Sequence, residues 1–317
     1  MNLTIILPTY NNERTLNECL KSIFSQDYSM SKYEVLLIDG GSADNTLIIA
    51  KKYPVKIINN PKRVEEAARI IGIKKARGKI IAFIDADNIL MGKDWITRMM
   101  RPFSDKRIFF ADTLYFSYRK NDKWGVKYQA LIGGDDPLAM YLGLYNRWCY
   151  LYGDWTDYPH EDLDRGDYLK CRLLNNKKVP PMGSNGFLIR TKILRKFVKE
   201  TFIHSDLIYE LVNNGYNSFA KVKTGIIHNQ PRFFSNKIRR IKRRVAKEVR
   251  IKYNYGMTKK NLLRASIYIA LIIPVIIDTI RGFIKKPESA WLFHPIACLG
   301  ELSIYVYNYI KSPFNIE

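Results

Sequence analysis

The chain has 317 residues, a formal net charge of +22 at pH 7 and a hydrophobic fraction of 47%. This length and composition exclude a disordered chain and allow one large domain or two smaller ones. The positive charge far exceeds what solubility needs, so we expect an anionic partner. The four cysteines are far apart and form no C-x-x-C pair, so nothing in their spacing indicates a zinc site or a disulfide framework.

The first hundred residues alternate between short apolar runs and segments with helical spacing. Strands are predicted at residues 3–7, 33–38, 55–58 and 79–84, and helices at 13–24, 43–52 and 64–76. Such alternation predicts a parallel sheet covered by helices. Ligands bind beyond the carboxyl ends of the strands in sheets of this kind, so the polar residues that follow each strand are candidate site residues.

The pattern is irregular over residues 109–181, which are dense in Tyr, Trp, Asp and Gly. We expect this stretch to supply the pocket for a second substrate. Helices are predicted again from about residue 192 and over 206–214, and a last strand over 219–227 leads to His228.

The clearest sign of chemistry is a buried strand that ends in two carboxylates, Asp85-Ala86-Asp87. Hard oxygen ligands at a strand end suit Mg²⁺ or Mn²⁺, which can bridge the two phosphates of a nucleotide sugar. The alternative is a solvated turn, because Asp-x-Asp is also a common turn sequence.

Four motifs follow one another in the first ninety residues. They are Pro8-Thr9-Tyr10-Asn11-Asn12-Glu13, Asp39-Gly40-Gly41-Ser42-Ala43-Asp44, Ala67-Ala68-Arg69 with Ala76-Arg77-Gly78-Lys79, and Asp85-Ala86-Asp87. In this order they resemble the family 2 glycosyltransferases, over roughly residues 3–230. The resemblance implies the GT-A fold, which is a Rossmann-like α/β nucleotide-binding sheet flanked by helices, and an inverting mechanism. Gly40 stands where the family often has a second Asp, which leaves Asp39 to contact the base.

The resemblance also implies a role for each matching residue. Pro8, Thr9, Tyr10 and Glu13 would line the nucleoside pocket, and Asp39 would accept a hydrogen bond from the base. Arg69 would lie near the ribose or the phosphates, unless it is only a surface arginine with a packed stem. The whole expected donor-binding set is Pro8, Thr9, Tyr10, Glu13, Asp39, Arg69, Asp85, Ala86, Asp87, Asn185 and Gly186.

Family members place the catalytic base at the start of a helix that follows a Gly-rich wall of the donor sugar. Gly183–Arg190 matches this wall, and Asp206 is the expected base, which would remove a proton from the acceptor hydroxyl. The common Glu-Asp pair is here Ser205-Asp206, so Asp206 is also explained by helix capping, and Glu210 is the reserve candidate.

The expected metal ligands are Asp87, Asp85 and His228, for Mn²⁺ or Mg²⁺. Several GT-A enzymes take a third ligand from a His at the place of His228. The alternative for His228 is a capped histidine that binds no metal.

The C-terminal part is first basic and then apolar. Residues 232–252 carry ten basic residues against one acid, and uncharged apolar runs follow at 265–277 and 289–300. We expect a basic amphipathic interfacial helix over 231–261 and a membrane-associated hydrophobic helical hairpin over 262–317. Each run of 12 or 13 residues covers about 20 Å of a hydrocarbon core near 30 Å. An interfacial or re-entrant hairpin, two full spans and a soluble hairpin therefore stay open, and Trp291 suits an interface belt.

The remaining 1–230 would form the catalytic domain, with a nucleotide-sugar half at 1–108 and an acceptor half at 109–230. We expect an inverting transfer of a hexose from GDP-mannose or a UDP-hexose to a lipid-linked acceptor, such as a polyprenyl or dolichyl phosphate or a lipid-linked oligosaccharide. The other expected partner is an anionic membrane surface rather than nucleic acid, since the basic residues adjoin apolar segments. No secretory leader precedes the first strand, so the catalytic part is expected on the cytoplasmic face of the cell membrane.

Two other functions compete with this prediction. A nucleotidyltransferase or nucleotide-sugar pyrophosphorylase has a similar sheet, although it would carry a Gly-rich basic loop where this chain has Pro8-Thr9-Tyr10. A catalytically inactive membrane-tethered scaffold is the other alternative.

Overall fold

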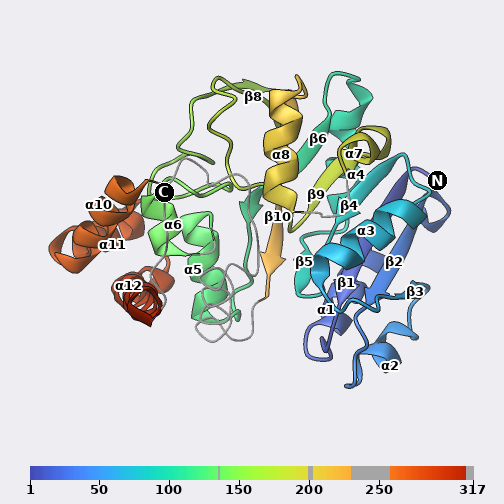
Figure 1. Cartoon of the computed structure of the whole chain (residues 1–317), viewed down its shortest axis with the longest axis horizontal. Coiled ribbons are helices and arrows are strands. Elements are labelled where there is room, and N and C mark those ends of the chain that lie inside the picture. Colours follow the sequence, from blue (N-terminus) through green and yellow to red (C-terminus); the bar gives the residue numbers. More distant parts are fainter. Residues whose placement is uncertain (135, 199–202, 230–257, 312–317) are drawn as a thin grey trace. The chain divides into compact units, whose positions relative to one another are not determined.

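The computed structural model describes residues 1–134, 136–198, 203–229 and 258–311. The chain divides into two units, residues 1–115 with 159–229 and residues 116–158 with 230–317 (Figure 1). The first unit therefore ends beside the boundary predicted at residue 230. Residues 116–158, which the sequence placed in the acceptor half, group with the C-terminal helices instead.

The first unit is built on one mixed sheet, in the order β3-β2-β1-β4-β9-β6-β10-β8-β7, with β5 paired to β10 off this path. The strands are β1 (Leu3–Thr9), β2 (Tyr33–Asp39), β3 (Lys56–Asn59), β4 (Ile80–Phe83), β5 (Asn88–Leu90), β6 (Phe110–Phe116), β7 (His160–Asp164), β8 (Tyr168–Leu173), β9 (Phe187–Arg190) and β10 (Phe219–His228).

The parallel sheet predicted for the first hundred residues is confirmed for β1 to β4. β1 pairs in parallel with β2 and β4, and β2 pairs in parallel with β3. β9 then adds to β4 in the antiparallel direction, as do β5 and β8 to β10. The parallel half is readable because strands buried on both faces are continuous apolar runs.

The helices of the first unit are α1 (Leu16–Phe24), α2 (Thr46–Ala50), α3 (Glu65–Lys75), α4 (Trp95–Met100), α7 (Thr191–Phe197) and α8 (His204–Asn213), with 3-10 turns η1 (Met30–Lys32) and η2 (Arg101–Ser104). The helices predicted over 13–24, 43–52 and 64–76 are present but shorter, α8 begins two residues before the predicted start, and α4 was not predicted. α3 packs closely on β1, since a Cβ built on Gly72 would lie 2.6 Å from the Ile6 side chain. This close approach places Arg69, on the same helix, beside the end of β4.

The stretch 109–181, which looks irregular in sequence, contains β6, β7 and β8. β7 lies at the edge of the sheet, and four of its five residues are exposed. Charged residues on an edge strand discourage pairing with other chains, and they also remove the apolar alternation by which a strand is recognised.

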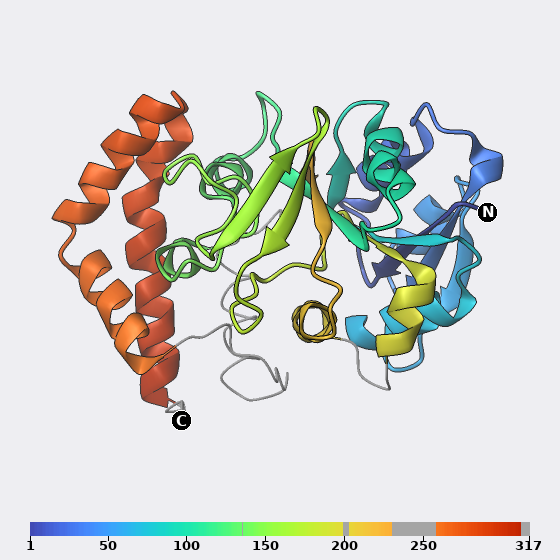
Figure 2. The ribbon, with the colours of Figure 1, turned by 90° about the horizontal axis from the view of Figure 1, so that it is seen from above.

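The second unit is helical in the residues that the structure describes. Its elements are α5 (Trp124–Ile132), α6 (Pro137–Tyr141), α10 (Lys259–Ala270), α11 (Ile273–Lys285), η3 (Ser289–Phe293) and α12 (His294–Lys311). α10 and α11 both pack along α12 (Figure 2). The basic helix predicted over 231–261 lies almost wholly outside the described residues.

The apolar run 265–277 does not form one straight helix. The chain turns between α10 and α11, where Ile272 has a φ of 61°, and the two helix axes differ by 81°. No single described helix is long and apolar enough to cross a membrane, although α10 and α11 pass the length and composition test as a bent pair. The interface position expected for Trp291 is wrong, because its ring is fully buried against Gly282.

Candidate functional site

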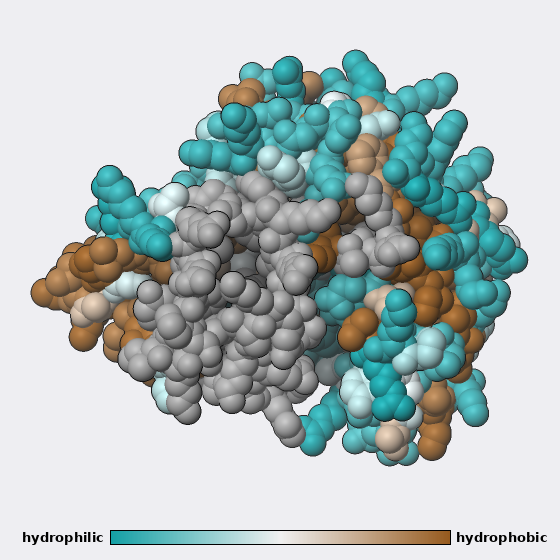
Figure 3. All heavy atoms as spheres, in the orientation of Figure 1, coloured by the Kyte–Doolittle hydropathy of each residue, from teal (hydrophilic) through white to brown (hydrophobic). Residues whose placement is uncertain are grey.

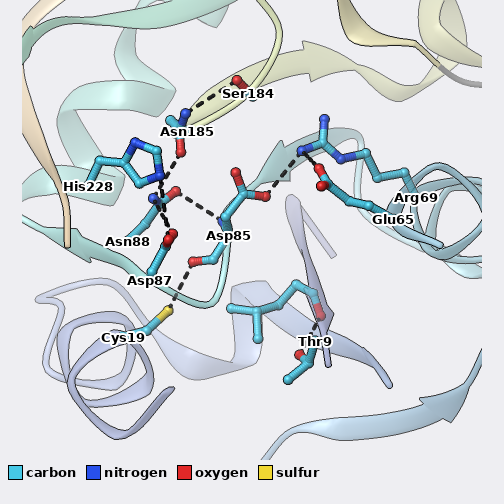
Figure 4. A network of polar contacts seen from close by, with 11 residues as sticks. Thr9, Cys19, Glu65, Arg69, Asp85, Asp87, Asn88, Ser184, Asn185 and His228 are labelled. Carbon is cyan, nitrogen blue, oxygen red and sulfur yellow. Dashed lines mark hydrogen bonds and ion pairs between the residues drawn. The ribbon is translucent and has the colours of Figure 1, made fainter. Parts of the chain in front are cut away.

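The turn between β4 and β5 is held together by one buried side chain, Asn88. Its Oδ1 accepts a hydrogen bond from the Asp85 backbone N–H (3.0 Å), and its Nδ2 donates to Asp87 Oδ1 (3.3 Å) and Asn185 Oδ1 (2.9 Å). Asn88 therefore ties the Asp85 backbone and the Asp87 carboxylate to the loop that precedes β9. The network is shown in Figure 4.

His228 is brought to this turn by strand pairing. In the antiparallel ladder of β5 and β10, His228 stands opposite Asn88. Its Nε2 lies 3.5 Å from Asp87 Oδ2, and its side chain is mostly buried. A carboxylate oxygen and an imidazole nitrogen that face each other at this distance are ligands that Mn²⁺ accepts, so the donor set fits a divalent cation.

The Asp85 carboxylate points away from this pair. Asp85 Oδ1 accepts from Arg69 Nη2 at 3.1 Å, and Arg69 also bonds Glu65, one turn before it on α3 (Figure 4). Burial raises the pKa of the Asp85 carboxyl to about 6, against the lowering effect of Arg69. The structure thus brings Asp87 and His228 together and pairs Asp85 with Arg69.

Arg69 is not a surface residue. Only 2% of its side chain is exposed, and its guanidinium lies over the Phe83 ring, 5.5 Å from the centroid. A buried cation beside Asp85 places positive charge at the end of β4, where the resemblance expects ribose or phosphates. That role stays a prediction.

The Asp39 turn is folded by hydrogen bonds to its own carboxylate. Asp39 Oδ2 accepts from the backbone N–H of Gly41 (2.9 Å) and Ser42 (3.0 Å), and Oδ1 accepts from Ser42 Oγ (2.6 Å). These bonds leave Asp39 Oδ1 with room for a further donor, as a base contact requires.

The residues after β1 lie beside this turn, because Thr9 is in register with Asp39. Tyr10 is 51% exposed, while Thr9 is buried and bonds the Leu7 carbonyl. Glu13 Oε2 accepts hydrogen bonds from the backbone N–H and the side-chain amide of Asn45, so it links the loop after β1 to the loop after β2. Pro8, which lies next to Thr9, is partly buried. A base that bound here would find the Tyr10 ring accessible.

Gly40 lies between Tyr10 and Arg63. A Cβ built there would lie 3.4 Å from Tyr10 Cδ2 and 3.5 Å from the Arg63 Cα, which is ordinary van der Waals contact. The space around Gly40 therefore does not explain why a glycine stands where the family often has a second Asp.

The Gly-rich loop before β9 also reaches the turn between β4 and β5. Gly186 has a φ of 89° and donates its N–H to the Phe83 carbonyl (2.9 Å), and a Cβ there would lie 3.1 Å from Trp95. Asn185, which bonds Asn88, has a left-handed φ of 51°, which Asn tolerates better than most residues. The loop and the buried Ala86 thus lie beside the carboxylates, and their contact with the donor stays a prediction.

Asp206 lies in the first turn of α8, and this end of the helix adjoins the Gly-rich loop. A Cβ on Gly183 would lie 2.8 Å from His204 Cβ, so loop and helix are in close contact. The N-cap residue of α8 is Ile203, so Asp206 is not the N-cap. Its role as the catalytic base stays a prediction, as does that of Glu210.

Two residues of the site carry no role in the sequence prediction. Asn88 is the hydrogen-bonding centre of the turn, and Cys19 on α1 lies beneath it, with its Sγ 3.6 Å from the Asp85 carbonyl. Burial and the nearby carboxylates Asp87 and Asp85 raise the pKa of the Cys19 thiol. A polar residue directly after Asp85-Ala86-Asp87 was the available signal for Asn88, whereas no local pattern points to Cys19.

Residues 4–196 match the family described as Glycosyl transferase family 2, which is more than half of the chain. The chain belongs to this family. The mixed sheet with its flanking helices is accordingly the GT-A fold, and the protein is a glycosyltransferase.

This glycosyltransferase is similar over short segments to curated relatives. Glycosyltransferase AglE of Haloferax volcanii is 38% identical over 91 residues, which are 27% of this chain and 30% of the relative. A Methanococcus voltae enzyme is 37% identical over 91 residues, 26% of this chain and 28% of the relative. Its name is dolichyl N-acetyl-alpha-D-glucosaminyl phosphate 3-beta-D-2,3-diacetamido-2,3-dideoxy-beta-D-glucuronosyltransferase. The chain thus spans less than a third of these relatives.

Among solved structures, the glycosyltransferase is similar to the mannosyltransferase PcManGT from Pyrobaculum calidifontis, which was solved with GDP-Man and Mn²⁺. The TM-score is 0.54 at 15% identity, and the match covers 100% of this chain and 88% of that chain. This likeness is one of fold.

Proposed function

We propose that the chain is an inverting, metal-dependent glycosyltransferase that moves a hexose from a nucleotide-diphosphate sugar to a lipid-linked acceptor. The donor is GDP-mannose or a UDP-hexose. The acceptor is a polyprenyl or dolichyl phosphate, or a saccharide linked to such a lipid. The reaction takes place at the cytoplasmic face of the cell membrane.

The observation that carries this proposal is the pairing of Asp87 with His228 across the β5–β10 ladder, beside the buried Asp85–Arg69 ion pair. Asp87 and His228 would hold Mn²⁺ or Mg²⁺, and Asp85, whose carboxylate is paired with Arg69, would have to turn toward them to complete the set. When bound, the cation supplies charge that stabilises the departing diphosphate. PcManGT, solved with GDP-Man and Mn²⁺, supports this choice of donor and metal.

The chain's own groups would then act in defined places. Asp39 accepts a hydrogen bond from the base, and Arg69 adds positive charge on the phosphate side. When the acceptor is a lipid-linked saccharide, Asp206 takes the proton from its hydroxyl as that oxygen attacks the anomeric carbon from the face opposite the diphosphate. A polyprenyl phosphate would attack from the same face through an oxygen that is already ionised, so it needs no base. Attack from that face inverts the anomeric configuration.

A lipid acceptor is supported by two observations outside the sheet. The name of the Methanococcus voltae relative specifies a dolichyl N-acetyl-alpha-D-glucosaminyl phosphate, which is a saccharide linked to a lipid phosphate. The second unit of this chain presents aliphatic side chains to solvent on α10 and α11. Both observations fit the transfer of one sugar at a time to an acceptor that is held in the membrane.

The test is a panel of GDP, UDP and their sugars, each with and without Mn²⁺, read as thermal shift and as transfer of labelled sugar to short polyprenyl phosphates. Stabilisation by one nucleotide, only with Mn²⁺, would support the proposal through binding linkage. Absence of any nucleotide response would contradict it. Release of diphosphate from a nucleoside triphosphate would indicate a nucleotidyltransferase instead.

Asp206→Asn separates chemistry from donor binding. We expect transfer to the hydroxyl of a lipid-linked saccharide to fall about 10²-fold to 10⁴-fold, because the proton acceptor is lost, while the Mn²⁺-dependent nucleotide shift is kept. Glu210→Gln, one helical turn further on α8, is the matched control and should change transfer little. Near-normal turnover of Asp206→Asn with a large loss in Glu210→Gln would move the base to Glu210.

A further inference from the structure

One side of α11 is aliphatic and open to solvent. Its exposed side chains include Ile273, which is 69% exposed, and Ile284, which is 73% exposed. Between them Ile276, Ile277, Ile280 and Phe283 are also exposed. The hydrophobic colouring over α10 and α11 is visible at the left of Figure 3.

The opposite side of α11 is buried and fixed by polar contacts. Asp278 Oδ2 accepts hydrogen bonds from the hydroxyls of Tyr141 (3.0 Å) and Tyr268 (2.9 Å). Gly282 lies against the Trp291 ring, where a Cβ would come within 2.6 Å. α11 is therefore oriented by its polar side, so its aliphatic side cannot turn inward without breaking these contacts.

The neighbouring helices α10 and α12 also have one exposed apolar side and one buried side. On α10, Leu263 and Ile267 are exposed while Ile269 is buried, and on α12, Ile296 is exposed while Glu301 is buried. Such one-sided helices lie in an interface, whereas a membrane span is apolar on all sides. α10 and α11 have 12 and 13 residues, so each is about 20 Å long, which is too short for a core of about 30 Å.

Positive charge flanks the aliphatic surface at both ends. Residues 258–286 contain six basic residues and one acid, and that acid is the buried Asp278. Lys259, Lys260 and Arg264 lie in the first half of α10, and Lys285 ends α11. The ten basic residues within 232–252 precede them in sequence. Basic groups at the edge of an aliphatic face are complementary to anionic lipid headgroups.

We propose that the outer face of α10 and α11, formed by Leu263, Ile267, Ile273, Ile276, Ile280 and Ile284, inserts into one leaflet of an anionic bilayer with both helices parallel to its surface. Apart from Phe283, the exposed large hydrophobic side chains of this face are aliphatic, whereas protein interfaces are typically enriched in aromatic residues. This proposal rests on the membrane location proposed above. Its test contains neither donor nor acceptor, so its failure is distinguishable from failure of the transfer proposal.

The first experiment is co-sedimentation of the full chain with vesicles of phosphatidylcholine, with and without 30% phosphatidylglycerol. We expect binding to the anionic vesicles that weakens as NaCl is raised. The double variant Ile276→Asp, Ile280→Asp should lower the partition coefficient at least tenfold, because two carboxylates would enter the apolar layer.

The matched control places the same substitution on exposed aliphatic residues of the first unit, Ile48→Asp with Leu174→Asp, and should bind like the unchanged chain. A milder variant, Ile267→Ser with Ile284→Ser, covers the case in which the aspartates disturb folding. Equal vesicle binding by all variants would overturn the proposal. Concentration-dependent dimerisation that the variants abolish, without vesicle binding, would assign the face to a second copy.

Depth is measured with a fluorophore on Ile276→Cys, since all four native cysteines are buried. Lipid quenchers placed near the headgroups should quench the label, and quenchers at the bilayer centre should not. Strong quenching at the centre would indicate a membrane-crossing arrangement and would overturn the in-plane geometry.

Discussion

Each unit contains an aspartate near a histidine, and the two clusters differ in what lies between these groups. In the first unit, the Asp87 carboxylate and His228 Nε2 face each other directly at 3.5 Å. In the second unit, the Tyr141 hydroxyl lies between Asp278 and His294, donating to Asp278 Oδ2 (3.0 Å) and lying 2.9 Å from His294 Nε2.

The second cluster is complete without a ligand. The Tyr141 hydroxyl has one proton, which it gives to Asp278, so its oxygen accepts from His294 Nε2–H. His294 Nδ1 then accepts from the Tyr128 hydroxyl at 2.5 Å. Burial lowers the pKa of His294 to about 4, which keeps the ring neutral, as this hydrogen-bond pattern requires.

The difference teaches how to separate a binding site from a structural network made of the same residue types. Two groups with lone pairs that face each other need a cation or a proton between them, whereas alternating donors and acceptors need nothing further. This criterion supports the proposal that Asp87 and His228 hold a cation, whereas Asp278 and His294 form part of the packing of α6, α11 and α12.

Asp87→Ala should have the largest effect on activity. Loss of the carboxylate removes half of the facing pair, and we expect sugar transfer to fall about 10³-fold, with loss of the Mn²⁺-dependent nucleotide shift. The free energy of unfolding without metal should change by less than about 1 kcal/mol. Asp94→Ala, an exposed carboxylate of the same unit, is the control. An unchanged Mn²⁺-dependent nucleotide shift in Asp87→Ala would contradict the distinction between the two clusters.

His294→Ala should have the opposite profile. The substitution leaves a cavity and removes the partner of two tyrosine hydroxyls, so the free energy of unfolding should fall by about 3 kcal/mol. The thermal shift caused by nucleotide and Mn²⁺ should stay the same. Chemical denaturation with and without ligands measures both quantities, and a lost Mn²⁺ response would mean that this cluster is not only structural.

Lowering the pH should reduce the stability that the second cluster provides, by less than the His294→Ala substitution does. The pKa of His294 is lowered in the folded protein, so between pH 6.5 and about 4 the unfolded chain binds more protons, and stability falls as pH falls. Between pH 7.5 and pH 5.5 this group should cost about 1 kcal/mol. In His294→Gln, which does not titrate, the difference in unfolding free energy between these two pH values should shrink by that amount. An equal pH dependence in both proteins would contradict the assignment.

Much of the first unit could be predicted from sequence because its signals are local. A buried strand that ends in Asp85-Ala86-Asp87, and a last strand that ends in His228, are each visible within ten residues. The Asn88–Asn185 hydrogen bond joins residues 97 positions apart, and no local pattern indicates it. The antiparallel half of the sheet was missed for a related reason, since β7 is mostly exposed and charged.

The second unit shows more clearly what local sequence patterns cannot predict. The apolar run 265–277 predicts a helix, but the break at Ile272 depends on packing of α10 and α11 against α12. His294 sits in a sequence without any catalytic or ligand pattern, and its tyrosine partners come from α5 and α6, more than 150 residues earlier. Such networks are set by tertiary contacts rather than by spacing.

β5 and β10 pair over only three residues, which makes the site sensitive to insertions and deletions within these strands. Asn88, Ile89 and Leu90 stand opposite His228, Ile227 and Ile226. Since neighbouring side chains of a strand point to opposite faces, an insertion or deletion of one residue here would turn the imidazole to the far side of the sheet and bring an aliphatic side chain towards Asp87. Insertions in homologues and engineered variants should therefore be tolerated in the loops around this ladder and excluded from within it.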